Sequence, residues 1–319
     1  MRCLRFFLLF LPSLLSVSAA AQDYPSKPVR IVVPYAAGGG TDTVARLVAT
    51  RLAATLGQPV VVENKPGASA NIGAEFVARA PADGYTILVT APNFTTSEAL
   101  FEKLTWKFED FIPVVHLVRY ANVLVASTQS QIPGVEQMIA RAKSQPGSLT
   151  YGTPGTASNT HLAMELLKQR AGFSMQHVPY KGSGLLKNDL LGGHVPIGAD
   201  GLGGQMDLIK AGKVKALAVL APNRSSFAPD LPSLGDLGIK DVDGTGWYGA
   251  LLPAGTPVAV VTRLHKEFAA ALQMSEIRAR LTSIGVEAVG GSSEEFRNYL
   301  LNERNKWAAI IKTAQIKAD

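Results

Sequence analysis

Cysteine is absent from nearly the whole of this sequence. The only cysteine among 319 residues is Cys3, close to the N-terminus. From residue 4 onward the chain therefore has no disulfide, no thiol nucleophile and no cysteine metal ligand. Charged residues are also scarce, at 18%, and Lys and Arg form no run that could track a phosphate backbone. This distribution argues against nucleic acid as a partner.

Long apolar runs are absent too, except at the N-terminus. Arg2 and Arg5 precede an apolar stretch at 6–15, and small residues follow as far as Ala21. This order is typical of a secretory signal peptide, here residues 1–21, with cleavage near Ala21. A retained membrane anchor is the alternative, but the stretch is shorter than the roughly 18 to 20 residues that cross a bilayer. We therefore expect an exported protein of the periplasm that is soluble after cleavage.

Short β-rich runs alternate with longer amphipathic stretches along the rest of the chain. The β-rich run 29–33, which is apolar except for Arg30, precedes apolar residues that recur at helical spacing between 44 and 52. Strands alternating with helices predict an α/β fold with largely parallel sheets covered on both faces. The expected strands are 29–33, 60–62, 85–90, 123–126, 149–151, 175–178, 195–199, 214–220 and 247–252. The expected helices are 44–56, 72–80, 135–143, 159–171, 185–191, 205–211, 258–273, 276–284 and one capped by Ser292 and Glu295.

Two such α/β units meet near Ala121, and the chain returns to the first unit near Leu220. About 300 residues remain after signal cleavage, more than a single hydrophobic core usually serves. We therefore expect two lobes, with 22–122 and 221–319 in the first and 123–220 in the second. A lobe built from both ends of the chain requires two crossings between the lobes, which makes a hinge.

Two glycine-rich loops, 34–42 and 152–160, each join an expected strand to an expected helix. A glycine turn at a helix N-terminus leaves backbone N–H groups unpaired, and the helix dipole adds partial positive charge there. In open α/β sheets such loops lie at the carboxyl ends of strands, where ligands bind. We therefore expect the two loops to face each other across a cleft and to hold an anion. The simpler alternative is that their polar residues are ordinary helix N-caps: Thr41, Asp42, Ser158 and Asn159.

Asp42 needs a separate interpretation, because its carboxylate would repel a carboxylate ligand. We interpret it as a cap, or as a partner for an amino group if the ligand carries one. The glycines at 38–40 are followed neither by Gly-Lys-Ser/Thr nor by the spacing of a dinucleotide fingerprint. Nucleotide binding is therefore not expected.

The catalytic constellations in the sequence are poor. Ser158, His161 and Asp200 are the residue types of a hydrolytic triad, but Ser158 and His161 lie within one helical turn and no G-x-S-x-G elbow is present. His161 and Glu165 are four residues apart without a third ligand, which argues against zinc. His177 lies in an expected strand and is interpreted as structural. We expect no cofactor, no metal and no enzymatic activity, with a hydrolase using Ser158 and His161 as the remote alternative.

A series of motifs runs along essentially the whole chain after the expected signal. They are YPSKPVR at 24–30, VPY at 33–35, GGGTD at 38–42, VENKPGA at 62–68, NIGA at 71–74, ADGYT at 82–86, THLA at 160–163, HVPYKG at 177–182, DLLGG at 189–193 and PAGTP at 253–257. In this order and spacing they resemble the Bug family, also called the TctC family, the solute receptors of tripartite tricarboxylate transporters.

The resemblance implies a two-lobed Venus-flytrap periplasmic binding protein, type II-like, that closes on a small organic carboxylate. Such a receptor is expected to act as a monomer and to present its ligand to membrane permease subunits. A sensor of the same fold that signals to a membrane kinase is the alternative. Backbone groups of the two glycine-rich loops are implied to hold one ligand carboxylate, with ordered waters in the cleft. The implied ligand-binding residues are Ala37, Gly38, Gly39, Gly40, Thr41, Asp42, Asn93, Thr153, Gly155, Thr156, Ala157, Ser158, Asn159, Thr160 and Asp200.

The sequence departs from the usual family pattern at both loops. Ala36 and Ala37 stand where proline is usual, and Pro154 and Ala157 stand where Ser, Gly or Asn are common. The residues around Asp200 are also smaller than usual. Fewer side-chain donors and more room favour a ligand other than a short amino-acid anion, one with an apolar or aromatic body.

Overall fold

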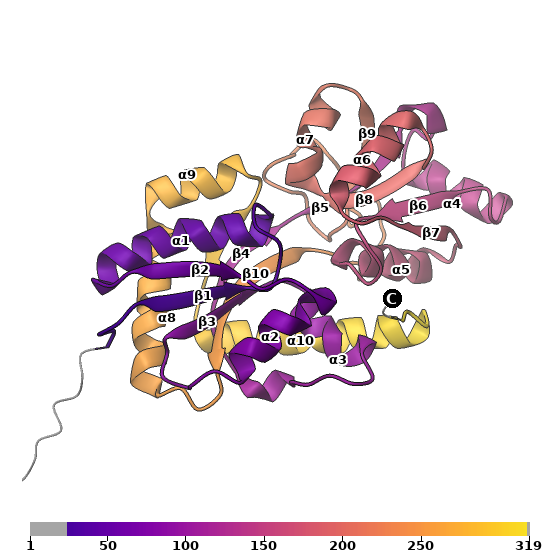
Figure 1. Cartoon of the computed structure of the whole chain (residues 1–319). Coiled ribbons are helices and arrows are strands. Elements are labelled where there is room, and N and C mark those ends of the chain that lie inside the picture. The colour runs from indigo at the N-terminus through magenta and orange to yellow at the C-terminus, as the bar shows by residue number, and fades with distance from the viewer. Residues whose placement is uncertain (1–23, 318–319) are drawn as a thin grey trace, which may run out of the picture.

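The structure, a computed structural model, describes residues 24–317. The expected signal peptide at 1–21 and its cleavage site lie outside this range. Within it the chain forms two lobes, each built around its own β-sheet (Figure 1). No helix of the described residues is long and apolar enough to cross a membrane.

The first lobe is built on a six-stranded sheet in the order β11-β4-β10-β3-β1-β2. Alternate residues of a strand face opposite sides, so Ile31 and Val33 enter one hydrophobic cluster with α1, α8 and α9, and Val32 enters another with α2, α3 and α10. Burial on both faces explains why only Arg30, which is exposed, interrupts the apolar residues at 29–33. The strands are β1 (Val29–Val33), β2 (Val60–Asn64), β3 (Thr86–Thr90), β4 (Phe111–Tyr120), β10 (Gly246–Pro253) and β11 (Glu287–Gly290). The helices are α1 (Gly40–Leu56), α2 (Asn71–Ala78), α3 (Asn93–Leu100), α8 (Val258–Gln273), α9 (Ser275–Ser283) and α10 (Ser293–Thr313).

The second lobe is built on a five-stranded sheet in the order β7-β6-β8-β5-β9. Its strand β5 also has two buried faces, since Leu124 packs in the cluster with α4 and α5, whereas Val123 and Val125 pack in the cluster with α6 and α7. The strands are β5 (Asn122–Ser127), β6 (Thr150–Thr153), β7 (Gln176–Pro179), β8 (Ile197–Gly201) and β9 (Val214–Val219). The helices are α4 (Val135–Ser144), α5 (Asn159–Ala171), α6 (Ser183–Gly192) and α7 (Leu202–Lys210).

The expectation of largely parallel sheets is wrong. Only β2-β1-β3 and β7-β6-β8 are parallel, whereas β10 runs antiparallel to both of its neighbours and β5 does the same in the second sheet. A parallel neighbour requires a crossover connection, usually a helix, but β5 and β10 enter their sheets directly from the other lobe.

No element was expected between 91 and 122, yet α3 and β4 lie there. Pro113 and His116 interrupt the apolar pattern of β4.

The two crossings between the lobes lie side by side. Only Ala121 separates β4 from β5, and the returning chain enters β10 at Gly246, which pairs with Tyr120. Asn122 Nδ2 donates a hydrogen bond to the Gly244 carbonyl at 2.6 Å, which ties the crossings together. The two predicted crossings are therefore present, and they form a narrow double connection suited to a hinge.

Helix α10 begins at the predicted capping box. The Ser292 hydroxyl accepts from the Glu295 N–H at 3.1 Å, and the Glu295 carboxylate accepts from the Ser292 N–H at 2.7 Å. Phe296, near its start, packs in the first lobe, whereas Trp307 packs in the core of the second. In Figure 1 this helix runs beneath the first lobe and ends below α5, so it links the lobes in addition to the crossings.

The segment between β9 and β10 also belongs to the second core, because Leu234 and Val242 are buried there. The expected boundaries of the lobes, with the return at 221, stay a prediction. From this packing we propose that the second crossing lies between 243 and 246.

Candidate ligand-binding cleft

A cavity of about 700 Å³ is lined by residues of both lobes. Five helices begin at this cavity, namely α1, α3, α5, α6 and α7. The first N–H groups of a helix have no partner within the helix, and the helix dipole adds partial positive charge there. None of the described lining residues is Lys, Arg or His. An anion in this cleft would therefore be held by helix ends and neutral donors. The lining residues at these helix ends are Gly39, Gly40, Thr41, Pro92, Asn93, Ser158, Asn159, Thr160, Gly182, Ser183, Gly201, Gly203 and Gly204.

The first glycine-rich loop leads directly into α1. Its N-cap is Gly39, which has an extended backbone and no capping side chain. Gly38 has a φ of +82°, a left-handed conformation that glycine adopts without strain. Gly40 lies against the Tyr248 hydroxyl, and a Cβ atom at this position would collide with that hydroxyl. Glycine here lets the loop turn and lets its backbone approach the cavity.

Asp42 lies inside α1, so the prediction of Thr41 and Asp42 as N-caps is wrong. The Asp42 carboxylate is 3% exposed and accepts hydrogen bonds from the N–H of Gly38, from Arg46 Nε and from Asn64 Nδ2, each at 2.9 Å. Burial alone would raise the pKa of Asp42, but these hydrogen bonds hold it below its ordinary value. The Asp42 carboxylate therefore holds the first glycine-rich loop in place, and its oxygens already accept hydrogen bonds from protein donors. It does not line the cavity.

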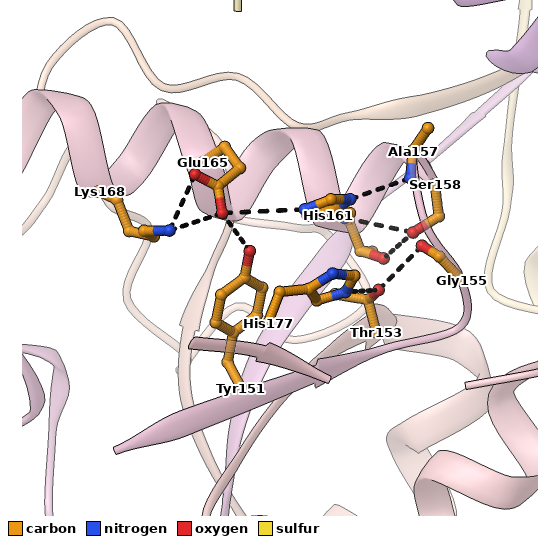
Figure 2. A network of polar contacts seen from close by, with 10 residues as sticks. Tyr151, Thr153, Gly155, Ala157, Ser158, His161, Glu165, Lys168 and His177 are labelled. Atoms are coloured by element: carbon orange, nitrogen blue, oxygen red, sulfur yellow. Dashed lines mark hydrogen bonds and ion pairs between the residues drawn. The ribbon is translucent and has the colours of Figure 1, made fainter. Parts of the chain in front are cut away.

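The second loop is shaped by side chains beneath it (Figure 2). Ser158 caps α5, as predicted, because its hydroxyl accepts from the His161 N–H at 3.3 Å. Ala157 has a left-handed φ of +56°, and its N–H donates to His161 Nδ1 at 2.9 Å. The Thr153 hydroxyl lies 2.8 Å from His177 Nε2. Asn159 was also expected as a cap, but it is the first residue of the helix.

The predicted binding residues separate into two groups. One group lines the cavity: Gly38, Gly39, Gly40, Thr41, Asn93, Ser158, Asn159, Thr160 and Asp200. The other lies in or beneath the loops without lining it: Ala37, Asp42, Thr153, Gly155, Thr156 and Ala157. The structure thus brings both loops to one cavity, although not every residue of either loop.

Asp200 ends β8 at the cavity but offers no free oxygen. It is 4% exposed, and one carboxylate oxygen accepts from the Ser183 hydroxyl and the Gly201 N–H, both at 2.8 Å. The other accepts from Gln205 Nε2 at 2.8 Å. A negative charge beside the N-termini of α6 and α7 is favourable, so Asp200 positions these two helix ends.

Three tyrosines line the cavity that local sequence patterns did not identify. They are Tyr35, after β1, and the hinge residues Tyr120 and Tyr248, whose rings lie 5.1 Å apart. Burial raises the pKa of Tyr248 to about 12 and raises that of Tyr120 as well. Both phenols therefore stay protonated at neutral pH. The only local signal is that Tyr35 follows the expected strand 29–33. Tyr120, the last residue of β4, meets Tyr248 of β10 only through sheet pairing.

The geometry does not support the remote hydrolase alternative. The ring nitrogen Nδ1 of His161 accepts from a backbone N–H, and Nε2 faces the Glu165 carboxylate at 3.8 Å. Both ring nitrogens are thus engaged elsewhere, and the Ser158 hydroxyl accepts from the His161 backbone N–H and lies 3.2 Å from Thr160 Oγ1. Among residues 24–317, no group of His, Cys, Asp and Glu is arranged to hold a metal ion.

Comparisons with known proteins agree with this geometry. The sequence profile of TctC, the tripartite tricarboxylate transporter family receptor, matches residues 44–316. Protein BugT of Bordetella pertussis is 30% identical over 306 residues, which cover 95% of this chain and 94% of BugT. The solved structure of R. palustris Rpa4515 with adipate has a TM-score of 0.82 and 34% identity, covering 92% of this chain and 99% of that one. MatC from Rhodopseudomonas palustris with bound malate has a TM-score of 0.78 and 30% identity, covering 90% of this chain and 100% of that one.

The two lobes, their double connection and the cleft define a binding protein of the Venus-flytrap class. Within that class the chain belongs to the TctC family, the periplasmic receptors of tripartite tricarboxylate transporters. The predicted family and the two-lobed fold class are thereby confirmed. Members of this family bind solutes and are not enzymes, which confirms the expected absence of catalysis.

Proposed function

We propose that this receptor captures a small organic carboxylate in the interlobe cleft and presents it, as a monomer, to the permease subunits of a tripartite tricarboxylate transporter. The observation that carries the proposal is that five helices begin at a cavity whose described lining has no cationic side chain. The likeness to Rpa4515 with adipate and to MatC with malate supports a carboxylate as the ligand. The signal-like sequence at 1–21 supports the periplasm as the place of action.

Neutral donors are sufficient for such a ligand. A helix N-terminus stabilises a nearby anion by about 0.3–1 kcal/mol when exposed and by up to about 2 kcal/mol when partly buried. Several converging termini therefore supply a few kcal/mol, and each contact strengthens when water is excluded. The free energy of closing the lobes therefore contributes to the binding free energy, and ligand affinity depends on the equilibrium between open and closed lobes.

The cavity divides the predicted residues by role. We propose that Gly38, Gly39, Gly40, Thr41, Asn93, Ser158, Asn159 and Thr160 face the ligand. In this proposal the remaining predicted residues shape the site from behind: Ala37, Asp42, Thr153, Gly155, Thr156, Ala157 and Asp200.

We further propose that the ligand carries no amino group and has an apolar or aromatic body. Asp42 of the first loop and Asp200 of the cavity lining each accept three hydrogen bonds from the protein. A ligand ammonium would therefore find no free anionic partner at either residue, and burying it unpaired is costly. Tyr120 and Tyr248 supply ring surface at the hinge side of the cavity.

A thermal-shift screen of the mature protein tests this function. Adipate, malate, benzoate, aspartate and glutamate would be compared, followed by calorimetric titration of those that stabilise. The proposal expects stabilisation by carboxylates without an amino group. Strongest stabilisation by aspartate or glutamate would contradict the ligand class, and no response to any carboxylate would contradict the function. Native mass spectrometry of the purified protein would identify a ligand that remains in the cleft.

A sensor of the same fold that signals to a membrane kinase is the remaining alternative. Capture of solubilised permease subunits by the ligand-loaded protein favours transport, and capture of a kinase instead would favour sensing. Size-exclusion chromatography with light scattering tests the monomer.

A further inference from the structure

Two stacked histidines lie beneath the second glycine-rich loop. His161 of α5 and His177 of β7 have ring centroids 3.7 Å apart and planes inclined by 15°. His161 is 5% exposed, and neither histidine lines the cavity. Figure 2 shows both rings between the loop and the Glu165 carboxylate. The function proposed above assigns no task to either ring.

Each histidine holds a different part of the loop. His161 Nδ1 accepts from the N–H of Ala157, the residue whose φ is +56°. Because Nδ1 is an acceptor here, the neutral ring carries its hydrogen on Nε2. The single hydroxyl hydrogen of Thr153 goes to the Gly155 carbonyl at 3.0 Å, so His177 Nε2 must donate to Thr153 Oγ1. The loop contacts therefore require that Nδ1 of His161 carry no proton and that Nε2 of His177 carry one.

Several titratable groups lie near His161. Nε2 of His161 faces Glu165, which accepts from the Tyr151 hydroxyl and from Lys168 Nζ at 2.7 and 2.9 Å. The His177 ring stacks on one face of the His161 ring, and the centroid of the Tyr151 ring lies 5.0 Å from that of His177. Lys168 thus already balances the charge of Glu165. Helix α10, which packs against α5, contributes Trp307, Ile310 and Ile311 to the same core. It also carries the buried Glu303, whose carboxylate accepts from Trp307 Nε1 at 2.8 Å and pairs with Lys306.

We propose that His161 and His177 are positioning residues that keep the second loop in its ligand-binding shape, and that a proton on His161 releases it. This inference rests on the proposed function for its effect on binding. A proton at Nδ1 would turn the acceptor for the Ala157 N–H into a second donor, and the hydrogen bond would be lost. It would also place positive charge against the His177 ring. The loop should therefore loosen as the pH falls, and ligand affinity should fall with it.

Hydrogen exchange of the peptide that covers 153–162 tests the positioning role without any ligand. His161→Asn keeps an acceptor at the place of Nδ1 but cannot gain a proton, whereas His161→Leu removes the acceptor. At neutral pH the His161→Leu variant should exchange roughly tenfold faster in this peptide, and His161→Asn should match the wild type. Equal protection in all three proteins would overturn the positioning role.

The pH profile separates positioning from ordinary core packing. When the pH is lowered stepwise from neutral, loop protection should fall in the wild type beyond the intrinsic change and stay level in His161→Asn. His265→Asn is the matched control, because His265 is half-buried on α8, far along the chain from the loop, and its ring lies 2.8 Å from the Gly291 carbonyl. The same pH response in wild type and His161→Asn would overturn the proposal, even if His161→Leu fails to fold.

Calorimetric titration with adipate, and with malate as the second probe, then measures the consequence for binding. Affinity of the wild type should fall over the same pH range, whereas that of His161→Asn should change less. If the wild type binds no carboxylate at neutral pH, the proposed function is contradicted. The positioning role of the histidines is not affected by that result, because the exchange experiment tests it without ligand. Unequal loop protection with equal affinities at every pH would contradict the link between loop shape and binding.

Discussion

Replacing Gly203 by alanine tests whether the lobes must touch for the receptor to bind its ligand. Gly203 lies in the first turn of α7, in the second lobe, and faces the chain that follows α9, in the first. A Cβ atom at Gly203 would lie 2.8 Å from the Ile284 carbonyl oxygen and 3.3 Å from Gly285 Cα. The nearest neighbours are backbone atoms, which cannot swing aside. The methyl group should therefore hold the lobes apart at this point.

The expected cost can be worked from this contact. Overpacking of a close contact costs about 1–3 kcal/mol. The cost falls on the state in which the lobes touch, so ligand affinity should weaken by roughly 5- to 150-fold. Within α7 itself, alanine is a better helix former than glycine by about 1 kcal/mol. The thermal stability of the ligand-free protein should therefore not fall.

Calorimetric titration of the wild type, Gly203→Ala and Gly204→Ala with the same carboxylate measures this effect. Gly204 is the matched control, because it also lines the cavity but its Cβ would meet only Lys187 Nζ, at 3.5 Å. Weak binding by Gly203→Ala alone, with a larger radius of gyration in X-ray scattering, supports the reasoning. Equal affinities of the two variants would refute it.

Three further predictions follow from single residues. Gly40→Ala should weaken ligand binding, because its Cβ would displace the Tyr248 hydroxyl, and adding Tyr248→Phe should restore part of the loss in the same titration. Asp42→Ala should lower the free energy of unfolding in urea by about 1–3 kcal/mol, because it leaves the Gly38 N–H without its acceptor and removes one contact of Asn64. The lowered pKa of Asp42 also means that its contribution is present above its ordinary pKa and lost on acidification below that value. Burial lowers the pKa of His116 to about 4 in the folded protein, whereas it stays near 6.5 in the unfolded chain. As the pH falls below 6.5, the unfolded chain therefore binds a proton that the folded protein does not. The free energy of unfolding should drop by about 2 kcal/mol between pH 7 and pH 5. In His116→Phe that part of the pH dependence should vanish in urea unfolding, and an unchanged slope would contradict the assignment.

Local chemistry was enough to predict most helices. The expected ranges 159–171 and 258–273 coincide with α5 and α8, because helical spacing and termination depend on neighbouring residues alone. The capping box before α10 was predicted for the same reason. Strand β4 was missed, since Pro113 and His116 break its apolar pattern and its place in the sheet depends on pairing with β10 and β11.

The site shows the same division. Both glycine-rich loops could be predicted because unpaired N–H groups at a helix N-terminus are a local property. The role of Asp42 could not, since two of its three donors, Arg46 and Asn64, are side chains brought to it by the helix turn and by β2.

By itself, the sequence determined the alternation of strands and helices, the two glycine-rich loops at helix starts and the family to which the chain belongs. These depend on residues close together along the chain or on motifs in a set order. Tertiary structure alone decided the strand directions, the meeting of five helix ends at one cavity and the pairing of Tyr120 with Tyr248 at the hinge. The reason is physical: the chain crosses between the lobes twice, and only the folded crossings bring distant residues into contact.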